Sequence, residues 1–472
     1  MIDPNDVTLR HPEYDAAEAS RTLVEDAAAG SESVKAKGDT YLPRPNPADE
    51  SPANRKRYDQ YLARAVYYNA TGRTLTTMNA YAFAVPPALD VSGAISYVAE
   101  DVDGAGVSLP QQSQSALRHA LASGRVGLLV DYPRVAAPAT RADMESGLVR
   151  AHVCLYPAAS ITNWRTERVG AKTVLTLVVL AEQHNVPTGF AIASETQYRV
   201  LRLTDGVYTQ EIWRKNDKGT FVIADGPNVI TDSSGKAWGE IPFQFVGAVN
   251  NDTVVDDSPL YDIAVLNIGH YRNSADYEES VYMAGQVQPW MSGLSVEWRD
   301  HMEKTGIYFG SRAPILLPEG GAFGLAQAQA NSLAYEAMKA KEEQMIALGA
   351  RLLQPGGAVK TATEAQSDSE AETSVIASIA ANVSDGYNAA LAWMAQFMGG
   401  GDGTYTIRAE QSAKALDAQM ASVLLNSVLA GKLPASDFWA ALRNSGNVSE
   451  ERTDEMLREE IAATAGNLLL EP

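Results

Sequence analysis

The sequence is poor in cysteine, with Cys154 alone among 472 residues. A lone cysteine excludes an intrachain disulfide and a four-cysteine metal site. Cys154 lies in an apolar, strand-like run, which predicts an inert core position. No run of about 18 apolar residues is present, and the polar N-terminus has no signal-peptide core. These absences predict a soluble protein made inside a cell, with no membrane contact.

Basic residues are also scarce, because 38 Lys and Arg stand against 58 Asp and Glu. The formal net charge is -20 and the isoelectric point is about 4.8. Tight nonspecific DNA binding needs many cations on phosphates, so this chain is expected to be a poor DNA binder. Contact through local basic groups, or passage of DNA without tight binding, stays open.

Sequence motifs of well-known nucleotide-binding and catalytic sites are missing. The sequence contains no GxxxxGK[ST] loop, no GxSxG elbow and no HExxH pair. Asp101, Asp103 and Gly104 suggest a calcium loop, but the bidentate acid of such a loop is absent. The six histidines are scattered, and His270 is expected to be packed or hydrogen-bonded. We therefore expect no enzyme activity, no catalytic residue, no metal and no cofactor.

One long stretch, Thr361 to Phe397, organises the rest of the chain. Its apolar residues recur every three or four positions, which predicts one face of a long helix. They are Val375, Ile379, Val383, Tyr387, Leu391, Met394 and, just beyond, Met398. In the preceding residues 352–360, Pro355 ends an incoming helix and Gly356-Gly357 permits a sharp turn.

The stretch carries five acids and no Lys or Arg. Its early acids suit a helix N-terminus, where negative charge is favoured. The acids are Glu364, Asp368, Glu370, Glu372 and Asp385. On this pattern alone, an ordinary surface helix of a globular protein is the favoured interpretation.

The remaining chain predicts an α+β protein. Helices are expected at 16–29, at 111–123, 258–283 and 325–353, and in short pieces at 413–466. Two further helices are expected between Arg57 and Pro86-Pro87, the first with Tyr58 to Tyr67 and the second with Leu75 to Phe83. Strands are expected at 126–132, 149–156, 174–181, 198–203, 207–213, 220–223, 306–309, 313–317 and 404–409. Asp205-Gly206 and Lys218-Gly219 favour hairpin turns between strands.

Six stretches in one order resemble the portal proteins of tailed bacteriophages, in a subgroup known as a domain of unknown function. The resemblance runs from about Tyr41 to Phe397. The stretches are NATGRTLTTMNAYAFAVPP, GRVGLLVDYP, LYPAASITNWRTE, IPFQFVGAVNN, SPLYDIAVLNIGHYRNSADYEES and EEQMIALGARLL…KTATEAQ…SIAANVS.

The resemblance implies a portal-protein fold with a helical stem, an α/β wing, a small clip, a long tunnel-side helix and a helical C-terminal crown. By order along the chain, residues 1–54 are a polar arm, 55–257 the wing and 258–284 the first stem helix. Residues 285–324 are then the clip, 325–353 the second stem helix and 354–366 the tunnel loop. Residues 367–403 form the long helix of the wing, and 404–472 form the crown.

The resemblance also implies a ring, typically of twelve subunits, at one capsid vertex of the virion, assembled in the host cytoplasm. This head–tail connector is the conduit for DNA packaging and ejection. Implied partners are double-stranded DNA, the terminase large subunit, the major capsid protein, scaffolding protein and a head–tail adaptor. The implied tunnel-loop residues are Gln354, Pro355, Gly356, Gly357, Lys360, Thr361, Thr363 and Glu364, with Arg351 and Asp368 as further charges facing the lumen.

Two alternatives stay open. A head–tail adaptor or another ring-forming virion component would share the acidic charge and the helices. An enzyme with an unrecognised site in the α+β region, around Asp131, Tyr132 and Trp164, would be active as a monomer or small oligomer.

Overall fold

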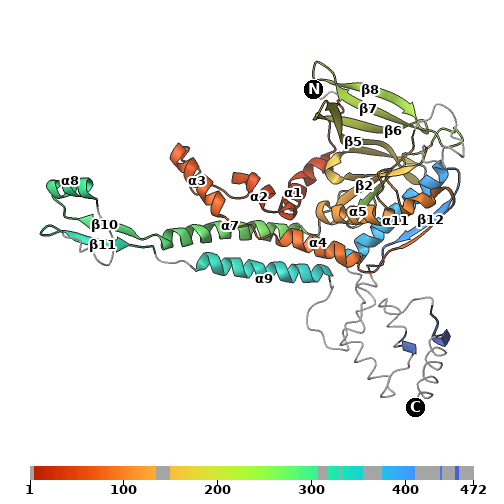
Figure 1. Cartoon of the computed structure of the whole chain (residues 1–472). Coiled ribbons are helices and arrows are strands. Elements are labelled where there is room, and N and C mark those ends of the chain that lie inside the picture. Colours follow the sequence, from red (N-terminus) through yellow and green to blue (C-terminus); the bar gives the residue numbers. More distant parts are fainter. Residues whose placement is uncertain are drawn as a thin grey trace, which may run out of the picture. The chain divides into compact units, whose positions relative to one another are not determined.

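The computed structural model describes residues 5–133, 149–306, 317–328, 332–353 and 375–409, with short pieces at 436–437, 439 and 452–456. The chain is α+β, and its elements divide into two compact units (Figure 1). Unit 1 contains residues 1–28, 70–265 and 347–472, and unit 2 contains residues 29–69 and 266–346. The strands predicted at 306–309 and 313–317, most of the tail helices, and the start of the acidic helix lie outside the described residues.

The core of unit 1 is a three-stranded antiparallel sheet with the order β3-β2-β9. Its strands are β2 (Arg125–Asp131), β3 (His152–Pro157) and β9 (Phe243–Gly247). Six consecutive residues of β2 are buried. The strand lies between β3 and β9, and helices α5 and α11 also pack on it. The short apolar run predicted as a strand at 126–132 is thereby confirmed.

Helix α11 (Val375–Phe397) packs on β2 and β9 of this sheet (Figure 1). The predicted apolar stripe is buried from Ile379 to Met398, but Val375 at its start is 38% exposed. Gly386 has a packing role, because a Cβ at this position would lie 2.4 Å from Cγ2 of Val246. In its described part this helix therefore belongs to the core, and a surface helix is the wrong interpretation.

Further helices complete the core of unit 1. They are α1 (Pro12–Ala29), α4 (Ala70–Ala82) and α5 (Leu109–Ser123), together with the 3-10 turns η2 (Gly93–Ala99) and η3 (Ala158–Ser160). Ser108 and Gln111 form a capping box at the start of α5, and Gly124 ends it in the left-handed region. Strands β1 (Ala88–Ser92) and β12 (Asp402–Thr406) pair antiparallel, which confirms a strand near the predicted 404–409.

The second sheet of unit 1 has five antiparallel strands in the order β4-β5-β6-β7-β8. They are β4 (Ile161–Val169), β5 (Lys172–Thr188), β6 (Ala191–Thr204), β7 (Val207–Lys215) and β8 (Phe221–Val229). Asp205 and Gly206 have φ of 51° and 73°, so they form the predicted two-residue turn. Strand β4 was missing from the prediction, and β5 and β6 extend far beyond it.

Unit 2 is mainly helical. It contains α2 (Ser31–Ala36), η1 (Gly38–Thr40), α3 (Pro52–Arg64), α8 (Val296–Thr305) and most of α7 (Tyr261–Gly285) and α9 (Leu333–Leu353). Between α7 and α9, strands β10 (Gln288–Ser292) and β11 (Ala322–Ala326) pair antiparallel (Figure 1). The helix predicted over 325–353 therefore starts too early, because Leu325 pairs with Pro289 in this ribbon.

In the part of the chain that the structure describes, every helix is too short or too polar to cross a membrane.

Candidate functional site

The tunnel-loop residues named from the sequence cannot be placed. Gln354, Pro355, Gly356, Gly357, Lys360, Thr361, Thr363, Glu364 and Asp368 lie outside the described residues. Arg351 lies in α9, but its side chain is also outside the description. The described residues contain two other candidate features, the helical hairpin of unit 2 and the polar groups of unit 1.

The helical hairpin of unit 2, α7 and α9, is held by contacts that run antiparallel along the two helices. His270 Nε2 lies 3.3 Å from Glu342 Oε1, and Lys341 Nζ donates to Asn273 Oδ1 at 2.6 Å. His270 is 2% exposed, which confirms the expected packed histidine. Burial lowers the pKa of His270 although Glu342 opposes this, so the ring is mainly neutral at pH 7.

Helix α3 and the residues after it bind the opposite side of α7. Tyr61 donates to Asp276 Oδ1 at 2.6 Å, and Arg64 forms an ion pair with Glu279. Asn267 accepts from the Tyr67 hydroxyl at 2.9 Å. Asp276 and Glu279, two acids of α7, are therefore paired within unit 2.

The side chains of helix α9 are more exposed to solvent than those of α7. Among the α9 side chains that the structure describes, Met345 alone is buried. Leu333 is 70% exposed and Ile346 is 73% exposed. Apolar residues elsewhere in unit 2 are exposed as well, including Val281, Met283, Val287, Trp290, Val296 and Leu325. Unit 2 therefore leaves several large apolar side chains open to solvent on α7, α8, α9 and the β10–β11 ribbon.

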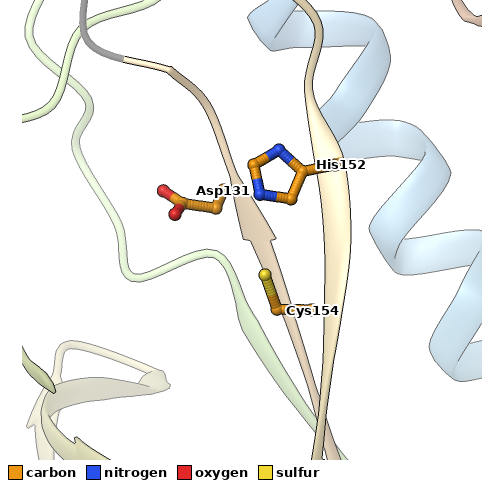
Figure 2. Close-up of side chains that lie close together, drawn as sticks. All are labelled: Asp131, His152 and Cys154. Atoms are coloured by element: carbon orange, nitrogen blue, oxygen red, sulfur yellow. The ribbon is translucent and has the colours of Figure 1, made fainter. Parts of the chain in front are cut away.

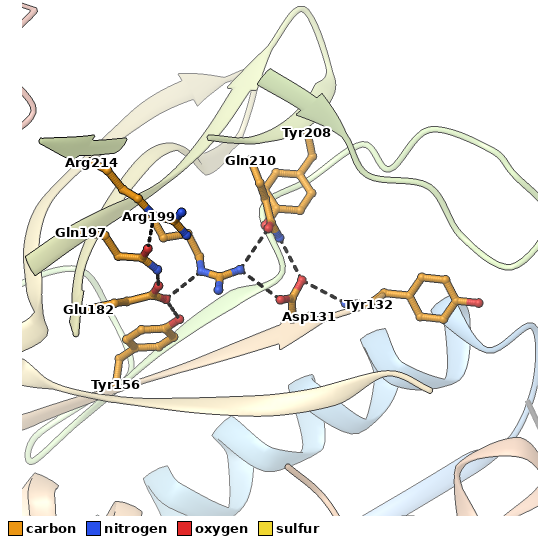
Figure 3. A network of polar contacts seen from close by, with 9 residues as sticks. All are labelled: Asp131, Tyr132, Tyr156, Glu182, Gln197, Arg199, Tyr208, Gln210 and Arg214. Atoms are coloured by element: carbon orange, nitrogen blue, oxygen red, sulfur yellow. Dashed lines mark hydrogen bonds and ion pairs between the residues drawn. The ribbon is translucent and has the colours of Figure 1, made fainter. Parts of the chain in front are cut away.

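A buried polar network in unit 1 joins the two sheets (Figure 3). Arg199 on β6 donates through Nε to Glu182 Oε1 at 2.7 Å and through a terminal nitrogen to Asp131 Oδ2 at 3.1 Å. Tyr156 and Gln197 also donate to Glu182, at 2.6 and 2.8 Å. One cation thus faces two carboxylates from different sheets.

The pKa values of the network follow from this geometry. Burial by itself would raise the pKa of Glu182, but Arg199 and the donors Tyr156 and Gln197 outweigh it, so the pKa is lowered. The pKa of Arg199 is raised because nearby acidic groups outweigh its desolvation. Both charges persist at neutral pH, and Arg199 links the two sheets through its ion pairs with Glu182 and Asp131.

Asp131, His152 and Cys154 lie close together, with potential ligand atoms within 4.8 Å of one another (Figure 2). They share one face because Asp131 is opposite His152 in the β2–β3 register and Cys154 follows two residues later. Asp131 already accepts from Arg199 and, at 3.0 Å, from Gln210. Burial raises the pKa of Cys154 to about 12, whereas a metal needs the thiolate. These residues therefore fit a packed polar cluster better than a metal centre.

Trp164, the third residue of the alternative enzyme site, lies in a different environment from Asp131. It stacks on His11 with ring centroids 4.0 Å apart, and the Arg125 guanidinium lies 4.5 Å from its ring. Arg125 is 2% exposed, and burial lowers its pKa to about 10, so it stays charged at pH 7. Among the described contacts, Trp164 therefore serves aromatic and cation–π packing, not a site shared with Asp131.

Comparison with protein-family models finds a match for one part of the chain. Residues 259–398 match the model described as "Domain of unknown function (DUF4055)", which is less than half of the chain. This segment includes α7, α9 and α11. No curated protein matches the chain.

Solved structures of gene transfer agent (GTA) particles contain similar chains, each 13% identical. One, from "Neck of empty GTA particle computed with C6 symmetry", has a TM-score of 0.40 and covers 78% of this chain and 88% of that chain. Another, from "Virion of native gene transfer agent (GTA) particle", has a TM-score of 0.39 with 82% and 91% covered. A chain from the neck of the native particle, computed with C12 symmetry, scores 0.37 with 79% and 89% covered. At these TM-scores the similarity carries no argument about fold or function.

Proposed function

We propose that the chain is a portal protein of a tailed phage, a ring-forming component of the virion without enzymatic activity. The observation that carries the proposal is the helical hairpin of α7 and α9, which exposes large apolar side chains, Leu333 and Ile346 among them, beside charged ones. A 21-residue helix draws most of its stability from tertiary packing. Since the residues that the structure describes supply little packing for α9, we infer that neighbouring copies supply the rest.

The order of elements supports the same proposal. The resemblance to portal proteins requires two stem helices with a small clip between them. The chain has α7, then a β10–β11 ribbon with α8 between its strands, then α9. The assignment of this part as stem and clip, and of the wing, tunnel loop and crown around it, remains our proposal.

The proposed ring acts as a passive conduit at one capsid vertex. A terminase motor would drive double-stranded DNA through it, scaffolding and capsid proteins would surround it, and an adaptor would later close it. The net charge of -20 per chain suits this role, because many phosphate contacts would hold the duplex and stall its movement. A ring also multiplies every charge by the number of subunits.

Negative-stain imaging of the purified full chain tests the proposal. We expect rings with a central hole, whereas a monomer at micromolar concentration would contradict it. A head–tail adaptor would also form a ring, so labelling of the chain in assembled particles must place it inside the capsid vertex and not on the tail side.

The exposed face of α9 gives a direct prediction for assembly. Leu333→Glu and Ile346→Glu, made separately, should each leave the folded monomer within about 0.5 kcal/mol of wild type, because both side chains are mostly exposed. Each should prevent ring formation, because it would bury charge against a neighbour. Size-exclusion chromatography with light scattering measures the result. The exposed Glu343→Ala on the same helix is the control, and rings from both glutamate variants would rule out α9 as the contact.

The tunnel loop gives a second prediction that concerns DNA alone. Lys360→Ala should assemble normally and change DNA packaging or retention, because each subunit would lose one phosphate contact. Packaged DNA per particle, measured by nuclease protection at two salt concentrations, reports the change. Lys172→Ala, at the exposed first residue of β5, is the matched control. Equal packaging and retention in wild type and Lys360→Ala would remove Lys360 from the proposed lumen.

A further inference from the structure

His270 lies in the contact between α7 and α9, with almost no exposure to solvent. Its side chain is 3% exposed, and Nε2 lies 3.3 Å from Oε1 of Glu342. From the residues after α3 it faces the ring of Tyr68, with ring centroids 6.0 Å apart. The other ring nitrogen, Nδ1, is buried and finds no hydrogen-bond partner among the described residues. A neutral imidazole fits this environment, because its single N–H can donate to Glu342.

The charged groups that act on His270 come from α9, and their sum is positive. Glu342 is the one acid among them, and its second oxygen accepts from Lys339 Nζ at 2.9 Å. Lys341 is the other cation. Its ammonium donates to Asn273, and its side chain passes so close to Gly269 that a Cβ there would lie 3.1 Å from Cε of Lys341. One carboxylate therefore faces two ammonium groups before His270 gains a proton.

Protonation of His270 would oppose the contact between α7 and α9 in two ways. The new Nδ1–H would be a buried, charged donor without an acceptor in the described residues, which is costly. The imidazolium would also be a third cation beside the single carboxylate of Glu342. The pKa of His270 is lowered because burial outweighs Glu342, which agrees with this geometry.

We propose that the His270–Glu342 contact makes the pairing of α7 and α9 sensitive to pH, so that α9 separates from α7 more readily in acid. The separated form exposes His270, whose pKa is then about 6.5, whereas the paired form takes up the proton only at lower pH. Pairing is therefore at full strength above about pH 6.5 and weakens as the pH falls below that value. In the proposed ring, acid would loosen the two stem helices, but the effect itself requires only one chain.

Hydrogen–deuterium exchange of α9 in the full chain tests the proposal, at pH values where light scattering gives the same oligomeric state. Between pH 7.5 and pH 5.5, corrected for the intrinsic pH dependence of exchange, protection of α9 amides should fall severalfold. The upper limit is about tenfold, because a freed histidine is about 90% protonated at pH 5.5. His270→Gln keeps an N–H donor for Glu342 but cannot titrate, so its α9 protection should not change. His301→Gln, at an exposed position of α8, is the matched control and should behave like wild type. Equal pH dependence of α9 in wild type and His270→Gln would overturn the proposal.

A second variant decides the question if His270→Gln does not fold. Lys339 is 51% exposed, so Lys339→Gln should leave unit 2 folded. With one ammonium fewer, Glu342 can pair with protonated His270, and the loss of α9 protection in acid should shrink toward zero. Lys304→Gln, at an exposed lysine of α8, should keep the wild-type response. An undiminished loss in Lys339→Gln would overturn the proposal. Because exchange is measured whether or not rings form, this contact and the proposed portal function can fail separately.

Discussion

Arg199→Met is expected to lower the free energy of unfolding of unit 1 by about 3–5 kcal/mol, the usual cost of removing one partner from a buried ion pair. Arg199 is the cation between Glu182 and Asp131, whose side chains are both only 16% exposed. Without it, two carboxylates stay desolvated at the junction of the two sheets. Urea unfolding at fixed protein concentration measures the loss.

The pH dependence of the decrease in unfolding free energy shows whether it comes from the broken ion pairs or from lost packing. The folded pKa of Glu182 is lowered, so its stabilisation is complete above its unfolded pKa of about 4.3 and is lost as pH falls through the folded pKa. In Arg199→Met, burial would raise the pKa of Glu182, which could then fold protonated. The difference in stability between variant and wild type should therefore be largest near pH 7 and shrink below about pH 4.

Arg168→Met on the same sheet is the matched control, because Arg168 is exposed and should change stability by less than about 0.5 kcal/mol. A loss for Arg199→Met that stays constant between pH 7 and pH 4 would show that packing, not charge, explains it.

Ile379→Asp is expected to unfold the core of unit 1, with a loss of more than about 4 kcal/mol. Ile379 is fully buried on the face of α11 that packs against the three-stranded sheet. A carboxylate there would lie among apolar side chains. Circular dichroism during heating, together with imaging, should show loss of both the folded core and any ring.

Ile379→Val serves as the control, since removing one methylene from a packed site costs about 0.5–1.5 kcal/mol. A stable Ile379→Asp protein that still formed rings would mean that α11 does not pack as described.

Several elements could be predicted because their signals are local. The i, i+3 and i+4 spacing of apolar residues predicted α11 and its buried face, and the run at 111–123 predicted α5. Asp205-Gly206 predicted a hairpin turn because few other residue pairs accept positive φ at both positions.

Other elements depend on partners that are remote in sequence. Strand β4 contains the polar run Thr166-Glu167-Arg168, and β10 contains Pro289, so neither shows a clear strand pattern. The helix expected from Leu325 was placed too early because its first residues pair with β10, which precedes them by more than thirty positions. Pairing across such distances overrides local preference.

The same contrast holds for the candidate sites. Asp131 and Trp164 were selected together from the sequence, yet Asp131 joins Arg199 and Trp164 packs on Arg125. No spacing rule predicts this, because Asp131, Glu182 and Arg199 come from three strands and meet only when two sheets are packed. The exposure of Phe190 was not predicted, for a similar reason. Thr-Gly-Phe is an ordinary turn sequence, and only the structure shows that no other segment covers this turn in the described residues.

The sequence by itself determined the α+β class, the acidic charge, most helices and the apolar stripe of α11, since these depend on composition and on neighbours a few residues apart. The tertiary structure decided which surfaces remain uncovered, which carboxylates meet a cation and how deeply His270 is buried. These properties depend on burial and on contacts between distant segments, which exist only once the chain is folded.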